Sequence, residues 1–463
     1  MFSKSGKISH LRWWIAALLT GAAVLNYVDR QTLSALAPTI QADLGMDDRA
    51  YADVVNLFLI AYTVAYLVSG RIADKIGTRA GMVLFVAWWS VANMLTAAAQ
   101  GVRSLGAFRF TLGLGEAGVW PAASKAVSEW FPAKERALAI GVYTMGATLG
   151  ATLAPYVVIP LATATYAGLC PAMEGLGPGA GWRMAFVLTG LAGLVWLYPW
   201  VRLYRLPQAS RRITADELKL IEQAADTEHL SDASPERAWS WGQVLRFRGT
   251  WLLLLGRLIT DPVWYFYQFW FPKYLSAGRH LPQERLTVTW IIYAAAGIGS
   301  LAGGWLSGRL IKRGTTPAAS RLWVMLGCAC LMPLSPLIAR VSGLNLALAL
   351  TVVTVMASLA WLINISSMVV DLVPKHSLGT VFSVVAAGST VGGILMNTIV
   401  AAMVSGPVSA VGFLDRTVET VLGPVFGLVQ GHGYAQWFWV MGFLHPIAWL
   451  MLKLGGISER HSE

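Results

Sequence analysis

Long apolar runs are the feature that most constrains how this chain can fold. Residues 80–99, 137–154 and 344–363 are examples of such runs. Each is close to the ~20 residues that a helix needs to cross the hydrocarbon core of a bilayer. Because a spanning segment must satisfy its own backbone hydrogen bonds, we expect these runs to be helices. A β-barrel would instead show short segments of alternating hydrophobicity, and the sequence has no such pattern.

The low content of charged residues supports this interpretation. The chain is 56% hydrophobic and 13% charged, with a mean hydropathy of +0.57, whereas a soluble domain has roughly 25% charged residues. Too few charges remain to cover a water-facing surface of 463 residues. We therefore predict an all-α membrane protein with twelve transmembrane helices at residues 12–37, 51–72, 80–99, 104–129, 137–161, 183–203, 250–273, 286–308, 320–339, 344–369, 379–404 and 435–453.

The distribution of Lys and Arg predicts the orientation of these helices. If the N-terminus is cytoplasmic, 24 of the 35 basic residues fall in cytoplasmic segments and helix ends, and eight fall in periplasmic segments. Short cytoplasmic loops of membrane proteins are enriched in Lys and Arg. We therefore expect a bacterial-type inner-membrane protein with both termini in the cytoplasm. The same rule explains the net charge of +11, so we expect no nucleic-acid partner.

One long polar segment divides the chain into two six-helix halves. We predict an N-terminal bundle at 1–203, a cytoplasmic linker at 204–249 and a C-terminal bundle at 250–463. Within the linker, Thr214 and Glu217 are predicted to form a capping box at the start of a short helix, which we interpret as a surface helix. The loops 162–181 and 405–434 are expected to be irregular and periplasmic, and the sequence assigns them no function.

The two halves carry related sequences. The segment GRIADKIG begins at Gly70, and GWLSGRLI begins at Gly304, 234 residues later. Two parallel six-helix repeats are typical of alternating-access carriers, in which the substrate binds near the bilayer midplane where the repeats meet. The repeat therefore predicts a secondary transporter.

Four ionisable residues fall inside the predicted spans. Asp29 and Arg30 lie in the first, and Arg109 and Glu116 lie in the fourth. Charges at this depth are costly and usually functional. The arginines offer planar forks that match a carboxylate, so we predict that they anchor an anion. Asp29 and Glu116 are predicted to bind protons. Glu116 lies two helical turns from Arg109, about 10 Å along the axis, so it need not form a direct ion pair. The alternative is that these four residues form structural ion pairs between the two helices.

Polar and aromatic side chains in other spans are candidates for substrate contacts. Hydroxyl and amide groups at the midplane can bind the hydroxyls of a sugar, and an aromatic face can stack on its ring. The alternative for each is helix–helix packing or hydrogen bonding. The candidates are Tyr27, Tyr62, Trp361, Asn364, Ser366, Ser367 and Asn397.

The segment from Gly70 to Arg79, GRIADKIGTR, resembles the signature that members of the major facilitator superfamily carry between their second and third helices. The resemblance implies a gate on the cytoplasmic face in which glycines permit close packing and charged groups form hydrogen bonds. The second copy is degenerate, because Gly308 stands where the first has Asp74. The gating residues that the resemblance implies are Gly70, Asp74, Lys75, Gly77 and Arg79.

Further segments resemble the anion:cation symporter family, and within it the hexuronate transporters. The resemblance covers nearly the whole chain. It implies that Asp29 and Glu116 are linked to protons, that an arginine engages the substrate anion, and that Tyr27 and Tyr62 contact substrate. The segments that carry it are LNYVDR at 25–30, RFTLGLGEAGVWP at 109–121, WFPAKER at 130–136 and DPVWYFYQFW at 261–270.

The expected function is proton-coupled symport of a small organic anion, with a hexuronate as the first candidate. An aldonate, an aldarate or an aromatic acid is the alternative substrate, and a membrane sensor built on a transporter fold is the alternative function. No nucleophile–base or metal-binding pattern and no nucleotide-binding loop is evident, so we expect neither an enzyme nor a cofactor or metal. We expect the protein to function as a monomer in the lipid bilayer.

Overall fold

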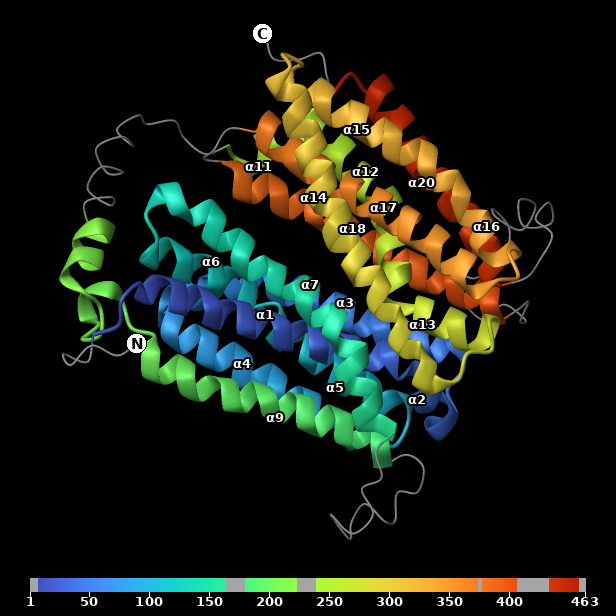
Figure 1. The fold of residues 1–463 in the computed structure, drawn as a ribbon, viewed down its shortest axis with the longest axis horizontal. Coiled ribbons are helices and arrows are strands. Elements are labelled where there is room, and N and C mark those ends of the chain that lie inside the picture. Colours follow the sequence, from blue (N-terminus) through green and yellow to red (C-terminus); the bar gives the residue numbers. More distant parts are fainter. Residues whose placement is uncertain (1–6, 164–179, 223–238, 374–376, 406–432, 458–463) are drawn as a thin grey trace. The chain divides into compact units, whose positions relative to one another are not determined.

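The computed structural model describes residues 7–163, 180–222, 239–373, 377–405 and 433–457, and every regular element in these ranges is a helix or a helical turn (Figure 1). The central parts of the loops 162–181 and 405–434 lie outside the described residues. The chain packs as two compact units: residues 1–44 with 57–236, and residues 45–56 with 237–463. The helix α3 therefore begins in the second unit and continues in the first.

The first unit contains the N-terminal helices. Its elements, with α3 shared between the two units, are α1 (Leu11–Ala35), α2 (Ala37–Leu44), α3 (Asp48–Ile76), α4 (Thr78–Thr96), α5 (Val102–Glu116), α6 (Val119–Trp130), α7 (Ala133–Thr163), α9 (Ala180–Leu203) and the 3-10 turn η2 (Pro207–Ala209).

The second unit contains the C-terminal helices. They are α11 (Trp241–Arg246), α12 (Arg248–Phe269), α13 (Phe271–Lys273), the π turn η3 (Tyr274–Gly278), the 3-10 turn η4 (Gln283–Thr289), α14 (Trp290–Lys312), α15 (Pro317–Leu331), the 3-10 turn η5 (Met332–Leu334), α16 (Ser335–Arg340), α17 (Leu344–Leu372), α18 (Leu378–Ser405) and α20 (Tyr434–Leu454).

Within the described ranges, eight helices are long and apolar enough to cross a membrane by themselves. The remaining predicted spans correspond to α3, α4, α12 and the pair α5–α6. The fourth span is divided between α5 and α6 at residues 117–118, where the chain comes close to α4: a side chain at Gly118 would come within 2.2 Å of the Phe85 ring. The prediction of an all-α membrane protein with twelve transmembrane helices is confirmed.

The packing within each unit shows the internal repeat. In the first unit α1 packs along α7, and α4 packs along α9 (Figure 1). In the second unit α12 packs along α18, and α15 packs along α20. These are the first–fifth and third–sixth pairings of each six-helix half. The repeat predicted from two short segments therefore extends to the arrangement of the helices.

The linker helix holds the start of α1. Residues 215–222 are helical, and Thr214 Oγ1 accepts a hydrogen bond from the Glu217 N–H at 3.4 Å, as predicted. The Glu217 carboxylate, however, accepts the backbone N–H groups of Leu11 at 2.9 Å and Arg12 at 3.1 Å. It also forms an ion pair with the Arg12 guanidinium at 2.8 Å. The interpretation as a plain surface helix is therefore incomplete, because this carboxylate caps the first transmembrane helix.

Replacing Glu217 with Gln should destabilise the first unit. The change removes the negative charge beside the buried Arg12, which then keeps only its pair with Glu135 at 2.9 Å. We expect a loss of about 3 kcal/mol, measured as a lower midpoint of thermal unfolding of the purified protein. The matched control is Glu222→Gln, which changes an exposed carboxylate on the same helix. Equal midpoints for the two variants would contradict the capping role.

Candidate functional site

Two adjacent residues of α1 point to different helices. Successive residues of an α-helix are rotated by about 100°, so the side chains of Asp29 and Arg30 point in different directions. Asp29 faces α4, where it accepts hydrogen bonds from Trp89 Nε1 at 3.1 Å and from Asn93 Nδ2 at 2.7 Å. Arg30 faces α5, where it meets Glu116. The two carboxylates predicted to bind protons therefore lie in different surroundings.

Arg30 and Glu116 form a buried ion pair. The Arg30 Nε and Nη2 groups both donate to Glu116 Oε2, at 2.9 and 2.7 Å. The Glu116 side chain is fully buried, and its second oxygen, Oε1, has no hydrogen-bond partner among the described residues. From the spacing to Arg109 we expected that Glu116 need not form a direct ion pair, but that spacing says nothing about Arg30 on α1, with which Glu116 pairs. The geometry is that of the predicted alternative, an ion pair joining the first and fourth spans.

Aromatic rings surround the Arg30 guanidinium. Its carbon Cζ lies 4.8 Å from the ring centroids of both Tyr27 and Tyr62 and 5.4 Å from that of Phe58. Such cation–π contacts strengthen when the cation is desolvated. The Arg109 Cζ also lies 5.4 Å from the Phe58 ring, and Arg109 Nη2 donates to the Arg30 carbonyl at 3.4 Å. The structure thus brings together all of the predicted first-unit residues except Asp29.

The formal charge of this cluster favours an anion. Arg30 and Arg109 contribute two positive charges, and ionised Glu116 contributes one negative charge. Asp29 belongs to a different hydrogen-bond network, in which its partner Asn93 also donates to Thr189 Oγ1 at 2.9 Å and to the Phe186 carbonyl at 3.2 Å. Asp29 is therefore bound to α4 and through Asn93 to α9.

Sequence reasoning missed several residues of this site. Phe58 contacts both arginines, and Trp89 and Asn93 hold Asp29. Asn26, one turn before Arg30 on α1, is fully buried, and neither end of its amide has a hydrogen-bond partner among the described residues. Polar residues such as Asn26 and Asn93 within apolar helices were the available signal, but their partners depend on how the helices pack.

The second-unit candidates are engaged in contacts within that unit. Asn364 donates to the carbonyls of Gly303 at 3.2 Å and Ala360 at 2.8 Å, and Ser367 donates to the Ile363 carbonyl at 2.8 Å. Ser366 on α17 is half-buried. The Asn364 geometry is typical of helix–helix packing, which was the predicted alternative.

Trp361 and Asn397 are also buried. Trp361 places its ring edge-on to His445, with centroids 5.1 Å apart. Asn397 accepts a hydrogen bond from Trp270 Nε1 at 2.8 Å and donates to Asn56 Oδ1 at 2.9 Å. Both ends of the Asn397 amide are thus used in binding α12 and the first turns of α3.

The predicted gate lies where α3 ends and α4 begins. Gly77 has φ +82°, a conformation that favours glycine because it has no Cβ. A side chain at Gly70 would lie 3.9 Å from Pro121. Arg79 Nη2 donates to the Val201 carbonyl at 2.6 Å, and Lys75 is exposed. The side chain of Asp74 lies outside the described part of the structure.

A second carboxylate near this turn was not predicted. Glu129 accepts a hydrogen bond from Thr78 Oγ1 at 2.7 Å and another from the Tyr204 hydroxyl. Burial raises the pKa of the Tyr204 phenol well above its ordinary value, and the negative charge of Glu129 acts in the same direction. Tyr204 therefore remains protonated and donates to Glu129, which joins the ends of α6 and α9. In the described ranges no group of three His, Cys, Asp or Glu residues is arranged to hold a metal ion.

Comparison with solved structures identifies the fold. A bacterial homologue of the human lysosomal transporter Spinster, in an inward-facing and occupied conformation, superposes with a TM-score of 0.74 at 20% identity over 97% of both chains. A D-xylose–proton symporter superposes with a TM-score of 0.66 at 13% identity over 97% of both chains. At these identities the likeness concerns the fold alone.

Comparison with characterised sequences identifies the relatives. The hexuronate transporter of Escherichia coli K12 is 32% identical over 302 residues, which cover 65% of this chain and 66%, just under two thirds, of that protein. The galacturonate transporter of Dickeya chrysanthemi is 31% identical over 65% of this chain and 82% of that protein. A D-galactonate transporter of Escherichia coli O6:H1 is 26% identical over 67% of this chain and 70% of that protein.

The family model for the Major Facilitator Superfamily matches residues 19–397, which include every charged residue of the site just described. The resemblance to hexuronate transporters, first seen in short segments, is confirmed over longer alignments. The chain therefore belongs to the major facilitator superfamily, a family of multi-pass membrane transporters and not of enzymes.

Proposed function

We propose that this protein is a symporter that carries a hexuronate together with a proton. The observation that carries the proposal is that the Glu116 carboxylate occupies the donors of Arg30. A carboxylate on a sugar acid has the same shape and charge as the Glu116 side chain. The substrate anion and Glu116 therefore compete for one guanidinium.

Protonation of Glu116 resolves this competition. A neutral carboxyl group no longer forms an ion pair with Arg30, so its bonds to the guanidinium weaken. Arg30 and Arg109 are then two cations that share the Phe58 ring without an anion between them. Entry of a proton thus favours entry of the anion, and loss of the proton restores the ion pair and expels the substrate.

The surroundings of Arg30 suit a sugar acid. The rings of Tyr27 and Tyr62 already lie against the guanidinium and offer both an apolar face and a hydroxyl group. The amide of Asn26 has hydrogen-bonding capacity for a substrate hydroxyl. The relatives include hexuronate and galacturonate transporters, which supports a monocarboxylate over an aldarate or an aromatic acid.

Asp29 is the second proton-linked group in this proposal. It is fully buried, and its two hydrogen bonds come from neutral donors, Trp89 and Asn93. No ion pair joins Asp29 to a cation among the described residues, so ionising it in this buried position is costly. A proton there relieves that cost without disturbing Arg30.

We also propose the orientation of the chain in the membrane, its division into two bundles and a cytoplasmic gate. Lys and Arg favour one side of the predicted spans, which supports an inner-membrane protein with cytoplasmic termini and a linker at 204–249 between bundles at 1–203 and 250–463. The bonds of Arg79 to the end of α9 support a gate at the α3–α4 turn, in which we include Gly70, Asp74, Lys75 and Gly77. We propose a monomer as the transporting unit.

The substitution Glu116→Gln tests this function. The amide imitates the protonated carboxyl group, so the variant should bind substrate and exchange it across the membrane without a proton. In proteoliposomes with labelled glucuronate, we expect counterflow to be retained. The parent should accumulate substrate about tenfold per pH unit of inward gradient if one proton enters per anion, and the variant should reach only equal concentrations on the two sides.

Two comparisons make that test decisive. Glu284→Gln changes an exposed carboxylate outside the site and should accumulate like the parent. A panel of galacturonate, galactonate, glucarate and an aromatic acid identifies the substrate class, with the hexuronates expected to compete best. If Glu116→Gln lost both counterflow and accumulation, Glu116 would be structural. If the variant still accumulated substrate, the proton would be carried by another group.

A separate pair of variants distinguishes the proton-binding role of Asp29 from a structural role. Trp89→Phe removes one of the two hydrogen bonds to Asp29 but keeps its carboxylate. We expect this variant to lose about 2 kcal/mol of stability and still to accumulate substrate, whereas Asp29→Asn should lose accumulation. Both are measured by thermal unfolding and proton-driven uptake. If Trp89→Phe abolished accumulation to the same extent, Asp29 would serve only as an anchor for α4.

A further inference from the structure

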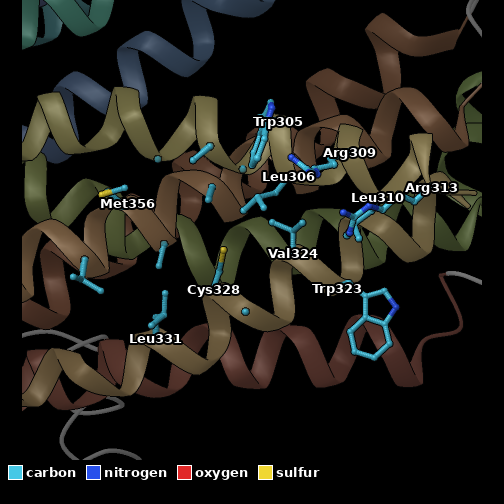
Figure 2. Close-up of a pocket in the computed structure, with 17 residues that line it drawn as sticks. Trp305, Leu306, Arg309, Leu310, Arg313, Trp323, Val324, Cys328, Leu331 and Met356 are labelled. Carbon is cyan, nitrogen blue, oxygen red and sulfur yellow. The ribbon is translucent and has the colours of Figure 1, made fainter. Parts of the chain in front are cut away.

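The second unit contains a large apolar groove between α14, α15 and α17. Its volume is about 790 Å³, which falls within the range of binding sites for small organic molecules. Figure 2 shows side chains from these helices around it. All of its lining residues belong to the second unit.

Small residues create the floor of this groove. A side chain at Gly303 would come within 2.6 Å of Ala360, and one at Gly299 would come within 2.4 Å of the Met356 carbonyl, so α14 and α17 are in close contact. Larger side chains stand at the rim, where Trp305 is 60% exposed and Trp323 is 62% exposed. These helices cross a membrane, so an exposed apolar groove on them offers a surface that an acyl chain can occupy.

The groove is charged at one end only. Figure 2 shows Arg309 and Arg313 toward the same end as Trp323, with Met356 and Leu331 toward the other end. α14 ends at Lys312, and the polar turn of residues 313–316 follows, so this end lies at the level of the lipid headgroups. Tryptophan and arginine side chains are typical of that level.

The charges of these two arginines are not neutralised within the described ranges. There, neither arginine forms an ion pair with a carboxylate, although the nearby Arg321 pairs with Asp371 at 3.3 Å. Arg309 instead lies over the Trp305 ring, at 5.3 Å from its centroid. In the sequence repeat, Gly308 stands where the first copy of the motif has Asp74. The degenerate copy has kept its cation and lost its acid.

We infer that this groove binds one anionic glycerophospholipid of the surrounding bilayer. Its phosphate accepts hydrogen bonds from the guanidinium groups of Arg309 and Arg313, which match a phosphate in geometry. Its acyl chain lies along the apolar floor toward Met356. Basic pockets between transmembrane helices recognise anionic headgroups in this way. The site lies within the second unit and shares no residue with the proposed transport site.

The test is lipid binding by the full-length protein. Delipidated protein in detergent is titrated with phosphatidylglycerol or with phosphatidylcholine of identical acyl chains, and bound copies are resolved by native mass spectrometry. We expect one copy of phosphatidylglycerol to bind about tenfold more tightly than phosphatidylcholine. The double variant Arg309→Gln/Arg313→Gln should reduce the affinity for phosphatidylglycerol to that for phosphatidylcholine.

Two further variants control for charge and for the acyl chain. Arg246→Gln/Arg248→Gln removes the same charge from exposed positions outside the groove and should leave the preference intact. Gly327→Leu fills the groove, since no atom lies within 4 Å of a Cβ there. It should weaken the binding of both lipids. A parent protein without preference, or an equal loss in the two double variants, would overturn the inference. The assay contains no transport substrate, so its outcome is independent of the proposed function.

Discussion

The buried ion pair between Arg30 and Glu116 is the interaction on which the site depends. It joins α1 to α5 through two hydrogen bonds to a single carboxylate oxygen, in a part of the chain where an unpaired charge would be very costly. Removing one partner of such a pair leaves the other charge buried and uncompensated. The protein can therefore release Arg30 only when something replaces Glu116 or when Glu116 loses its charge. In the proposed function, a substrate carboxylate and a proton supply these two conditions together.

The architecture follows almost directly from the sequence. Apolar length predicts a spanning helix because the bilayer leaves the backbone few alternatives, and α4 (Thr78–Thr96) and α17 (Leu344–Leu372) lie within a few residues of their predicted spans. The identity of the charged site residues was also predictable, since Arg30 and Glu116 stand out against apolar neighbours. Their pairing was not, because it depends on the rotation of α1 against α5, which the sequence does not specify.

The same limit applies to the other polar residues. Asn364 and Asn397 are recognisable as buried amides, but their hydrogen bonds to Gly303 and Trp270 are set by distant segments. Glu217 was predicted to cap its own helix, and its carboxylate instead caps α1, about two hundred residues away in the chain. The groove at Arg309 shows the opposite case, in which a substitution in a repeat, Gly308 for Asp74, indicates a changed partner. Local patterns thus predict which residues matter better than they predict what those residues contact.

The central claim is that an ion pair is exchanged for a protonated carboxyl group and a substrate-bound arginine. Calorimetric titration of the purified protein with glucuronate, in buffers of different ionisation enthalpy, measures the protons taken up on binding. The account predicts that the parent takes up protons as it binds substrate. When Glu116 is replaced by Gln, fewer protons should be taken up per bound substrate. Binding to the parent without proton uptake would contradict it.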